Sequence, residues 1–358
     1  MDVAVPAGAR WSCHACGACC RLFQLGPVAP AVIADLEQRG VAEAWAPAGS
    51  APWYERRQTP NGPAFYLRKV DGACVFLQPD TYCAVHRLYG ASAKPDFCQE
   101  FPFQVTHDPN GTVVTARGEC AGFYASSVDG EPLEGQVAEV LAIPRTRPIP
   151  RFAPQQVELI PGRSLPLNDW MDAEARVLAA LNAADGSPAA TVAVVRHALV
   201  SEGPPPDPAR FTLATRALLH TLGLVLDHVL STETNAPAAE ARFTAELREV
   251  LRRAELAIHG TTRPLSADAN RHLNLLLRSA ILSKSVHALG GVSYGLGLFL
   301  FNTELARLAA GGDASQPVSA REHSDVYTRL CRLTLNTTIH QVLLKARPAL
   351  LDLFLHAA

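Results

Sequence analysis

Four of the nine cysteines lie within one eight-residue stretch near the N-terminus. The stretch CHACGACC places thiols at Cys13, Cys16, Cys19 and Cys20, and the last two are adjacent. Clustered, reduced thiols are good ligands for zinc and for iron–sulfur clusters, whereas an isolated buried cysteine behaves as a small hydrophobic side chain. The pattern therefore predicts a metal centre at this end of the chain.

Four more cysteines follow within the first 120 residues: Cys74, Cys83, Cys98 and Cys120. Together, the eight thiolates suit two zinc sites of four thiolates each, or one [4Fe–4S] cluster with spare cysteines. If residues 13–20 are partly helical, their thiols share one face. If they form a loop, Gly17 supplies the flexible backbone. Adjacent side chains usually diverge, so Cys19 and Cys20 are not expected to serve one metal equally.

Histidines near the cysteines are substitute ligands, because zinc accepts mixtures of cysteine and histidine. The candidates are His14, His86 and His107, of which His86 follows Cys83 by three residues. The simpler interpretation of His86 is a solvent-facing residue on a turn. Cys331 stands alone in the apolar stretch YTRLCRLTL, and we expect it to be a small hydrophobic residue of a helix.

Composition indicates a globular protein with no nucleic-acid partner. The chain is 48% hydrophobic, and its net charge of -2 gives no basic excess for binding nucleic acid. The first residues lack a signal-peptide pattern, and the longest apolar stretch, near residue 290, is interrupted by charged residues and glycines. We therefore expect a cytoplasmic protein without a membrane partner, in which thiols stay reduced and disulfides are unfavourable.

Pattern and turn chemistry predict an α+β fold in three parts. Residues 1–140 form a small, irregular, cysteine-rich metal-binding domain, with a short helix ending at Gly40 and a loop over residues 46–63. A β-hairpin is predicted where two Val- and Thr-rich runs flank the DPNG turn of residues 108–111. This hairpin would carry Cys98 and Cys120 back beside each other.

Four closely spaced prolines in LAIPRTRPIPRFAP make residues 141–165 a Pro-rich, extended linker. Residues 166–358 form an all-α helical domain, because apolar residues recur at three- and four-residue spacing. Helices are expected over residues 209–231, 237–259, 265–289, 291–310 and 318–346. Glycines 290, 291, 295 and 297 would permit close helix contact or a helix break. Lys284 lies on an apolar stretch, where it could point into a pocket or lie on the helix surface.

Two blocks of the sequence resemble a known family. CHACGACC and CVFLQPDTYCAVHRLYGASAKPDFCQEFP are similar to the signature of the CxxCxxCC, YkgJ-type, zinc- or iron-chelating family, over about residues 11–124. The family usually has arginine before the proline of the second block and after its cysteine, where this chain has Lys94 and Gln99. The resemblance implies metal chelation by these cysteines.

In the C-terminal half, the stretch NRHLNLLLRSAILSKSVHALGGVSYGLGLFLFNTELARL, residues 270–308, is similar to the helical tail of flagellin lysine N-methylases. That similarity implies an iron–sulfur-dependent protein lysine N-methyltransferase that uses S-adenosylmethionine, with the helical half as its substrate cleft. The chain has no G-x-G-x-x-G after a strand, no P-loop and no CxxxCxxC spacing. The other hypothesis is a metal-binding protein, loaded with zinc or an iron–sulfur cluster, whose helical half binds a protein partner.

Overall fold

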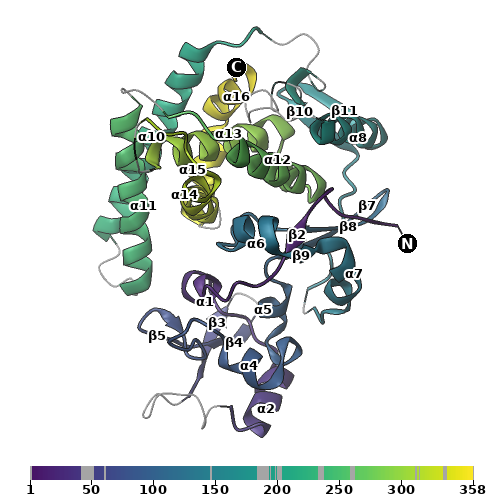
Figure 1. Ribbon diagram of the computed structural model, residues 1–358, viewed down its shortest axis with the longest axis vertical. Coiled ribbons are helices and arrows are strands. Elements are labelled where there is room, and N and C mark those ends of the chain that lie inside the picture. The colour runs from purple at the N-terminus through teal and green to yellow at the C-terminus, as the bar shows by residue number, and fades with distance from the viewer. Residues whose placement is uncertain are drawn as a thin grey trace.

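The computed structural model describes residues 2–41, 52–59, 62–145, 147–183, 193, 195–197, 199, 204–232, 238–258, 263–310, 313, 315–333 and 337–357. Over these ranges the fold is α+β, as expected, with short strands and helices in the N-terminal part and longer helices after residue 166 (Figure 1).

A small unit formed by residues 12–101, which we call the cysteine lobe, has its own apolar core. Leu36, Trp53 and Phe76 are among its buried residues. Its elements are α1 (Ala18–Leu22), α2 (Pro30–Gln38), β3 (Tyr54–Thr59), β4 (Gly62–Leu67), β5 (Lys69–Val70), β6 (Ala73–Cys74), α4 (Ala84–Tyr89), η1 (Ala91–Ala93) and α5 (Asp96–Glu100). The predicted short helix is α2. The prediction of a loop over residues 46–63 was wrong for residues 54–59 and 62–63, which form β3 and the start of β4 and pair with each other. Residues 46–51, 60 and 61 of the predicted loop lie outside the described residues.

The predicted hairpin is confirmed as β7 (Phe103–Asp108) paired with β8 (Gly111–Ala116), and β1 (Val3–Ala4) adds to β8 in parallel. Four short elements lie beside it: β2 (Arg10–Trp11) paired with β9 (Glu131–Pro132), and the helices α6 (Phe123–Asp129) and α7 (Leu133–Ala142). Buried hairpin residues such as Val105 and Val114 belong to the same apolar cluster as the long helices. The domain boundary at residue 140 stays a prediction, but the cores group this hairpin with the helical half.

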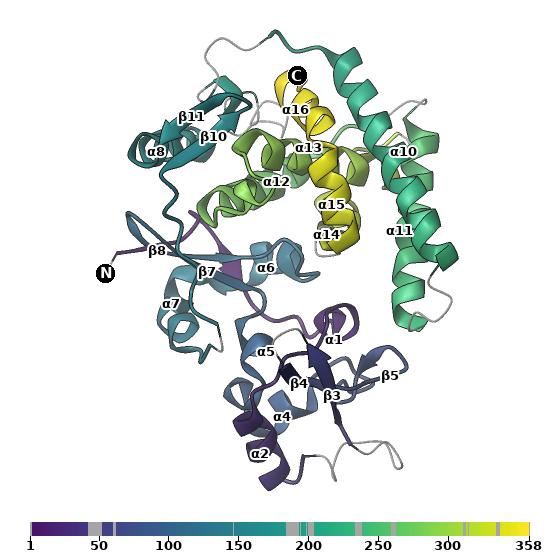
Figure 2. The same ribbon diagram turned by 180° about the vertical axis from the view of Figure 1, so that it is seen from behind.

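The expected linker contains a second hairpin. β10 (Gln156–Ile160) pairs with β11 (Arg163–Pro166), and the buried side chains of Val157 and Leu159 join the large core. An extended connector therefore describes only the first part of residues 141–165. This hairpin lies beside α8 (Leu167–Ala183), on the far side of the helical half from α11 (Figure 2).

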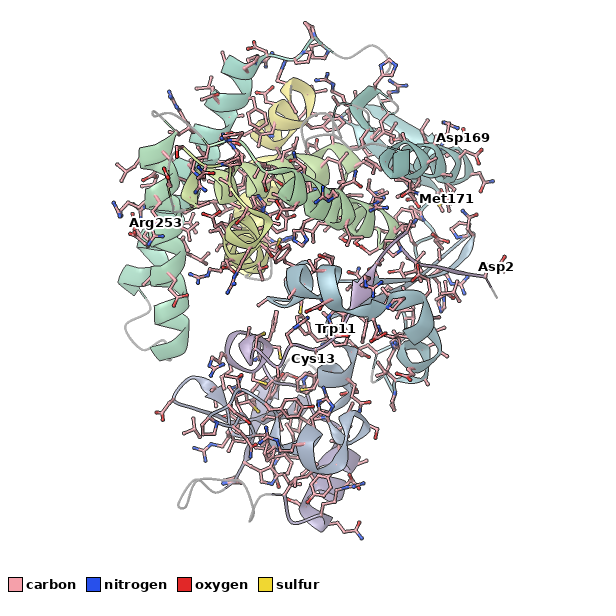
Figure 3. All side chains as sticks on the ribbon, in the orientation of Figure 1. Asp2, Trp11, Cys13, Asp169, Met171 and Arg253 are labelled. Atoms are coloured by element: carbon pink, nitrogen blue, oxygen red, sulfur yellow. The ribbon has the colours of Figure 1, made fainter. Side chains whose placement is uncertain are left out.

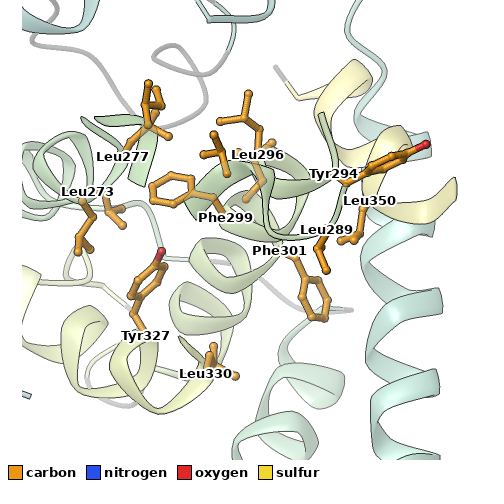
Figure 4. Close-up of a cluster of buried hydrophobic side chains, with 14 of the residues drawn as sticks. Leu273, Leu277, Leu289, Tyr294, Leu296, Phe299, Phe301, Tyr327, Leu330 and Leu350 are labelled. Atoms are coloured by element: carbon orange, nitrogen blue, oxygen red, sulfur yellow. The ribbon is translucent and has the colours of Figure 1, made fainter. Parts of the chain in front are cut away.

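The remaining helices pack around α13 (Val292–Ala309), whose apolar residues lie at the centre of the core (Figure 4). They are α10 (Pro208–Thr232), α11 (Ala238–Ala257), α12 (Ala267–Leu282), η2 (Ser285–His287), α14 (Ala320–Leu333), α15 (Thr337–Lys345) and α16 (Arg347–His356). The glycines of α13 allow close contact, as expected, since a Cβ at Gly297 would lie 2.0 Å from the Leu350 carbonyl oxygen. None of the described helices has both the length and the apolar character to cross a membrane.

Lys284 lies in the core and not on the helix surface. Its Nζ is 2.9 Å from Oδ2 of Asp108, at the end of β7, and also contacts Oε1 of Glu174 on α8. All three side chains are at most 4% exposed. Burial raises the pKa of Glu174 to about 7, although the neighbouring Lys284 ammonium lowers it. This ion triad fastens the β7–β8 hairpin to the helical half.

Candidate metal centre

All eight predicted cysteines line one cavity of about 300 Å³, between the cysteine lobe and the loops around β8 and α6. They come from five places: residues 13–20, the end of β6, the residue before α4, α5, and the loop after β8. Figure 3 shows sulfur atoms gathered in this region, near Cys13 and Trp11. Residues distant in sequence therefore converge on one volume, as a shared metal centre requires.

The first cysteine segment is half loop and half helix. Helix α1 begins at Ala18, after Gly17 in the left-handed conformation with φ 66°. Cys19 and Cys20 are thus on the helix, whereas Cys13 and Cys16 lie on the preceding loop. Of the two expectations for residues 13–20, the loop therefore describes the first half and the helix the second. A hydroxyl from Thr81 donates to the Ala15 carbonyl and holds this loop against the turn before Cys83.

The second cysteine block lies deeper. Cys74 is buried at the end of β6, and Cys83 is paired with Leu77 across an isolated bridge just before α4. Cys98 is in α5. The β7–β8 hairpin returns the chain, so Cys98 and Cys120 line the same cavity. Their electrostatic neighbours differ, because Cys98 interacts with Cys74, Cys83 and Cys19, whereas Cys120 interacts with Cys16 and Cys19.

The adjacent cysteines differ in their pKa values. Their Sγ atoms are 3.9 Å apart. The hydrogen bond from Cys20 lowers the pKa of Cys19 to about 6, against burial, and the Lys94 ammonium contributes in the same direction. The same hydrogen bond and burial raise the pKa of Cys20. The Cys19 sulfur is therefore the one of this pair held as a thiolate at neutral pH.

Burial dominates at the other thiols. It raises the pKa of Cys74 and of Cys120 to about 12 each, and it raises the pKa of Cys98 strongly. These thiols are protonated without a metal, so loading the site would release their protons.

Charged and polar side chains share the cavity wall with the thiols. Lys94, Arg117 and Glu100 line it, as do His14 and His86. Burial lowers the pKa of His86, which favours the neutral imidazole that a metal needs. His107 does not line this cavity; its Nδ1 is 3.0 Å from the Thr112 hydroxyl, so the structure does not bring it to the predicted site. Cys331 packs half-buried against the large core, away from the cavity.

Sequence reasoning missed Trp11, which also lines the cavity. Its indole stacks edge-on against Phe103, with ring centroids 4.7 Å apart. The sequence offered one signal for this residue, an aromatic side chain two positions before the first cysteine. The place of Trp11 also depends on the pairing of β2 with β9, which is distant in sequence.

The thiols surround the cavity, but their sulfur atoms do not converge on one point. Among the described residues, no three Cys, His, Asp or Glu side chains are grouped closely enough to hold an ion. Rotation of the thiol side chains into the cavity would be needed to bring them together. A zinc ion with Zn–S bonds of about 2.3 Å has sulfur–sulfur edges of about 3.8 Å. The 3.9 Å between Cys19 and Cys20 fits such an edge, whereas each iron of a cubane cluster takes a single thiolate.

The fold and the site define a domain in which eight cysteines line one cavity. Residues 12–121 match the CxxCxxCC family model, described as "Putative zinc- or iron-chelating domain", and thereby confirm the resemblance. The matched residues include all eight cysteines. No curated protein and no solved structure matches the chain, so the similarity to flagellin lysine N-methylases has no support from these comparisons.

Proposed function

We propose that the chain is an iron–sulfur protein whose cysteine lobe holds one [4Fe–4S] cluster. The observation that carries this proposal is the cavity of about 300 Å³ lined by eight thiols. A zinc ion with four thiolates fills the tetrahedron that they form and needs no further space. A cubane of four irons and four sulfides needs a cavity, four thiolates and a wall that tolerates its charge.

The wall meets these requirements. Cys74 is buried, burial raises the pKa of Cys98, and Lys94 lies close enough to act electrostatically on Cys98. The ammonium would offset the negative charge of a thiolate-bound cluster. When bound, the cluster would supply electron transfer or an iron-based binding site.

A structural zinc site is the second candidate. The observation that favours it is the 3.9 Å separation of the Cys19 and Cys20 sulfurs, which matches one edge of a ZnS₄ tetrahedron. The use of S-adenosylmethionine and methyl transfer to a protein lysine stay predictions, because they rest on the resemblance alone. A protein partner for the helical half also stays a prediction.

The test is metal and sulfide analysis of protein purified without oxygen, together with its visible spectrum. We expect about four irons and four sulfides per chain and a brown colour. The double variant Cys74→Ser/Cys98→Ser should lose both. Cys331→Ser, whose thiol lies away from the cavity, is the matched control and should keep them. Colourless protein with stoichiometric zinc would replace the iron–sulfur proposal with the zinc one.

A further inference from the structure

The cysteine lobe, residues 12–101, lies at one end of the molecule and has a core of its own (Figure 1). Its buried apolar residues run from Leu25 to Ala93. The rest of the chain, which we call the helical body, has a core of residues up to Ala9 and from Val105 onward. Within the part of the chain that the structure describes, the two cores share no residue. Bodies with separate cores move relative to each other unless a large apolar interface joins them.

The two backbone connections between these bodies lie side by side. The chain enters the lobe after Trp11 and returns from it before Phe103, and the rings of these two residues are 4.7 Å apart between centroids. On the entry side, the Ser12 carbonyl accepts a hydrogen bond of 2.8 Å from a serine hydroxyl of α6. On the exit side, the Pro102 carbonyl accepts one of 2.9 Å from the first amide after β8. Both connections are therefore anchored to the helical body, and the lobe is attached to it by a double hinge.

Beyond the hinge, the boundary between lobe and helical body is incompletely filled, because the cavity of about 300 Å³ lies there. Ion pairs cross the boundary at its edges. The Nε2 of His14 is 3.3 Å from Oδ1 of Asp129, and the Nε of Arg145 is 3.8 Å from Oε1 of Glu100. The two carboxylate side chains are 66% and 36% exposed, so solvent screens both attractions. These pairs are too weak to fix the lobe in one position.

The thiols are divided unevenly between the two walls of the cavity. Of the eight that line it, those at positions 13, 16, 19, 20, 74, 83 and 98 belong to the lobe. Cys120 belongs to the helical body and packs against its core. A Cβ placed on Gly122 would lie 3.7 Å from the Cys120 sulfur and 3.5 Å from the His14 ring, so Cys120 faces the entry segment of the lobe. A group bound by lobe thiols and by Cys120 would therefore crosslink the two bodies.

We propose that the cysteine lobe and the helical body form a clamp that closes when the cavity is filled, with Cys120 as the ligand that holds it closed. The lobe turns about the double hinge to admit the metal or cluster. Cys120 then loses its thiol proton to solvent as it binds. The loading of the centre thereby sets the position of the lobe relative to the helices. This proposal rests on the proposed function only for the presence of a thiolate-bound group in the cavity, and it applies equally to a cluster and to zinc.

Small-angle X-ray scattering of the full-length protein, loaded and metal-free, tests the clamp, with iron, zinc and sulfide measured in the same samples. A compact chain of this length has a radius of gyration of about 20 Å, and we expect the metal-free protein to exceed the loaded protein by about 1 Å or more. Hydrogen exchange of residues 117–122, which border the cavity, should be faster in the metal-free protein, and exchange of α13 should be unchanged. Retained protection of the β3–β4 hairpin shows that the lobe moves as a folded body, whereas its loss would overturn the clamp.

Cys120→Ser tests the crosslink itself. Four of the seven remaining thiols complete a cluster, so the variant should keep its iron while its radius and its exchange match the metal-free wild type. Loss of iron from this variant would also support the crosslink, because it makes Cys120 a ligand and every other thiol of the cavity belongs to the lobe. Cys331→Ser, whose thiol packs against the large core away from the cavity, is the matched control and should resemble the loaded wild type.

Two results would overturn the clamp. The first is an equal radius for loaded and metal-free wild type, whichever metal is found. The second is a loaded Cys120→Ser that stays as compact as the loaded wild type. Zinc in place of iron, with the expected change in radius, would overturn the proposed function and support the clamp.

Discussion

Replacing Lys284 with methionine tests how the hairpin is fastened to the helices. The substitution keeps the length of the side chain and removes its charge, which leaves the carboxylates of Asp108 and Glu174 buried without a cation. Removing one partner of a buried ion pair typically costs about 3–5 kcal/mol. We therefore expect Lys284→Met to lower the free energy of unfolding by about that amount at pH 7.

The pH dependence makes this prediction specific. Glu174 has a folded pKa of about 7, raised by burial from 4.5. The folded protein therefore holds a proton on Glu174 more tightly than the unfolded chain does. The resulting contribution to the free energy of unfolding is full below pH 4.5, the unfolded pKa, and is lost as the pH rises to about 7. The loss is about 1.4 kcal/mol per pH unit. Above pH 7 this contribution is constant in the wild type. Without Lys284, which lowers the pKa of Glu174, the decline should continue above pH 7.

Denaturant unfolding of metal-loaded protein at pH 7, 8 and 9, followed by circular dichroism, measures this difference. Lys345→Met, at an exposed position of α15, is the matched control and should change stability by less than about 0.5 kcal/mol. Adding Glu174→Gln to Lys284→Met should remove the extra decline above pH 7. A loss under about 1 kcal/mol in the single variant, with a wild-type pH profile, would refute the buried triad.

Three further predictions concern glycines and a buried histidine. Gly297→Ala should destabilise the protein by about 1–3 kcal/mol or more in denaturant unfolding, because its Cβ would lie 2.0 Å from a carbonyl oxygen of α16. Gly135→Ala, with open space around it on α7, should be neutral or stabilising. Gly17→Ala should reduce the iron content per chain, because the left-handed residue before α1 orients Cys19 and Cys20. Gly40→Ala, at a glycine with a similar positive φ, is the control and should keep its iron. Equal iron in both variants would contradict this role of Gly17. Burial lowers the pKa of His323 to about 4. Its contribution to the free energy of unfolding is therefore full above the unfolded pKa of about 6.5 and is lost as pH falls to 4. His323→Asn should flatten the dependence of that free energy on pH between 6.5 and 4, and an unchanged dependence would exclude this histidine as the cause of the acid destabilisation.

The sequence was informative about the metal site because reduced cysteines seldom cluster so closely in a chain unless they bind a metal. It also predicted the β7–β8 hairpin, whose turn residues are local signals. The convergence of the eight thiols on one cavity was beyond its reach, since Cys120 reaches the cavity only after the β7–β8 hairpin returns the chain. Contacts between residues so distant in sequence leave no local pattern.

Other features were missed because local pattern and tertiary context disagree. β3 has the sequence YERRQT, in which Arg56 and Arg57 are exposed, and only its two end residues, Tyr54 and Thr59, are of the types that mark a strand. β10–β11 lies just after four prolines, which made the whole segment resemble an extended linker. Lys284 is charged in an apolar stretch, and only the arrival of Asp108 and Glu174 from other elements makes its burial possible.

The most direct test of the iron–sulfur proposal is an anomalous difference map, collected on either side of the iron absorption edge, from crystals grown without oxygen. The account predicts one strong iron peak in the cavity that the eight thiols line. No iron peak there, with a zinc peak between Cys19 and Cys20 in its place, would contradict it.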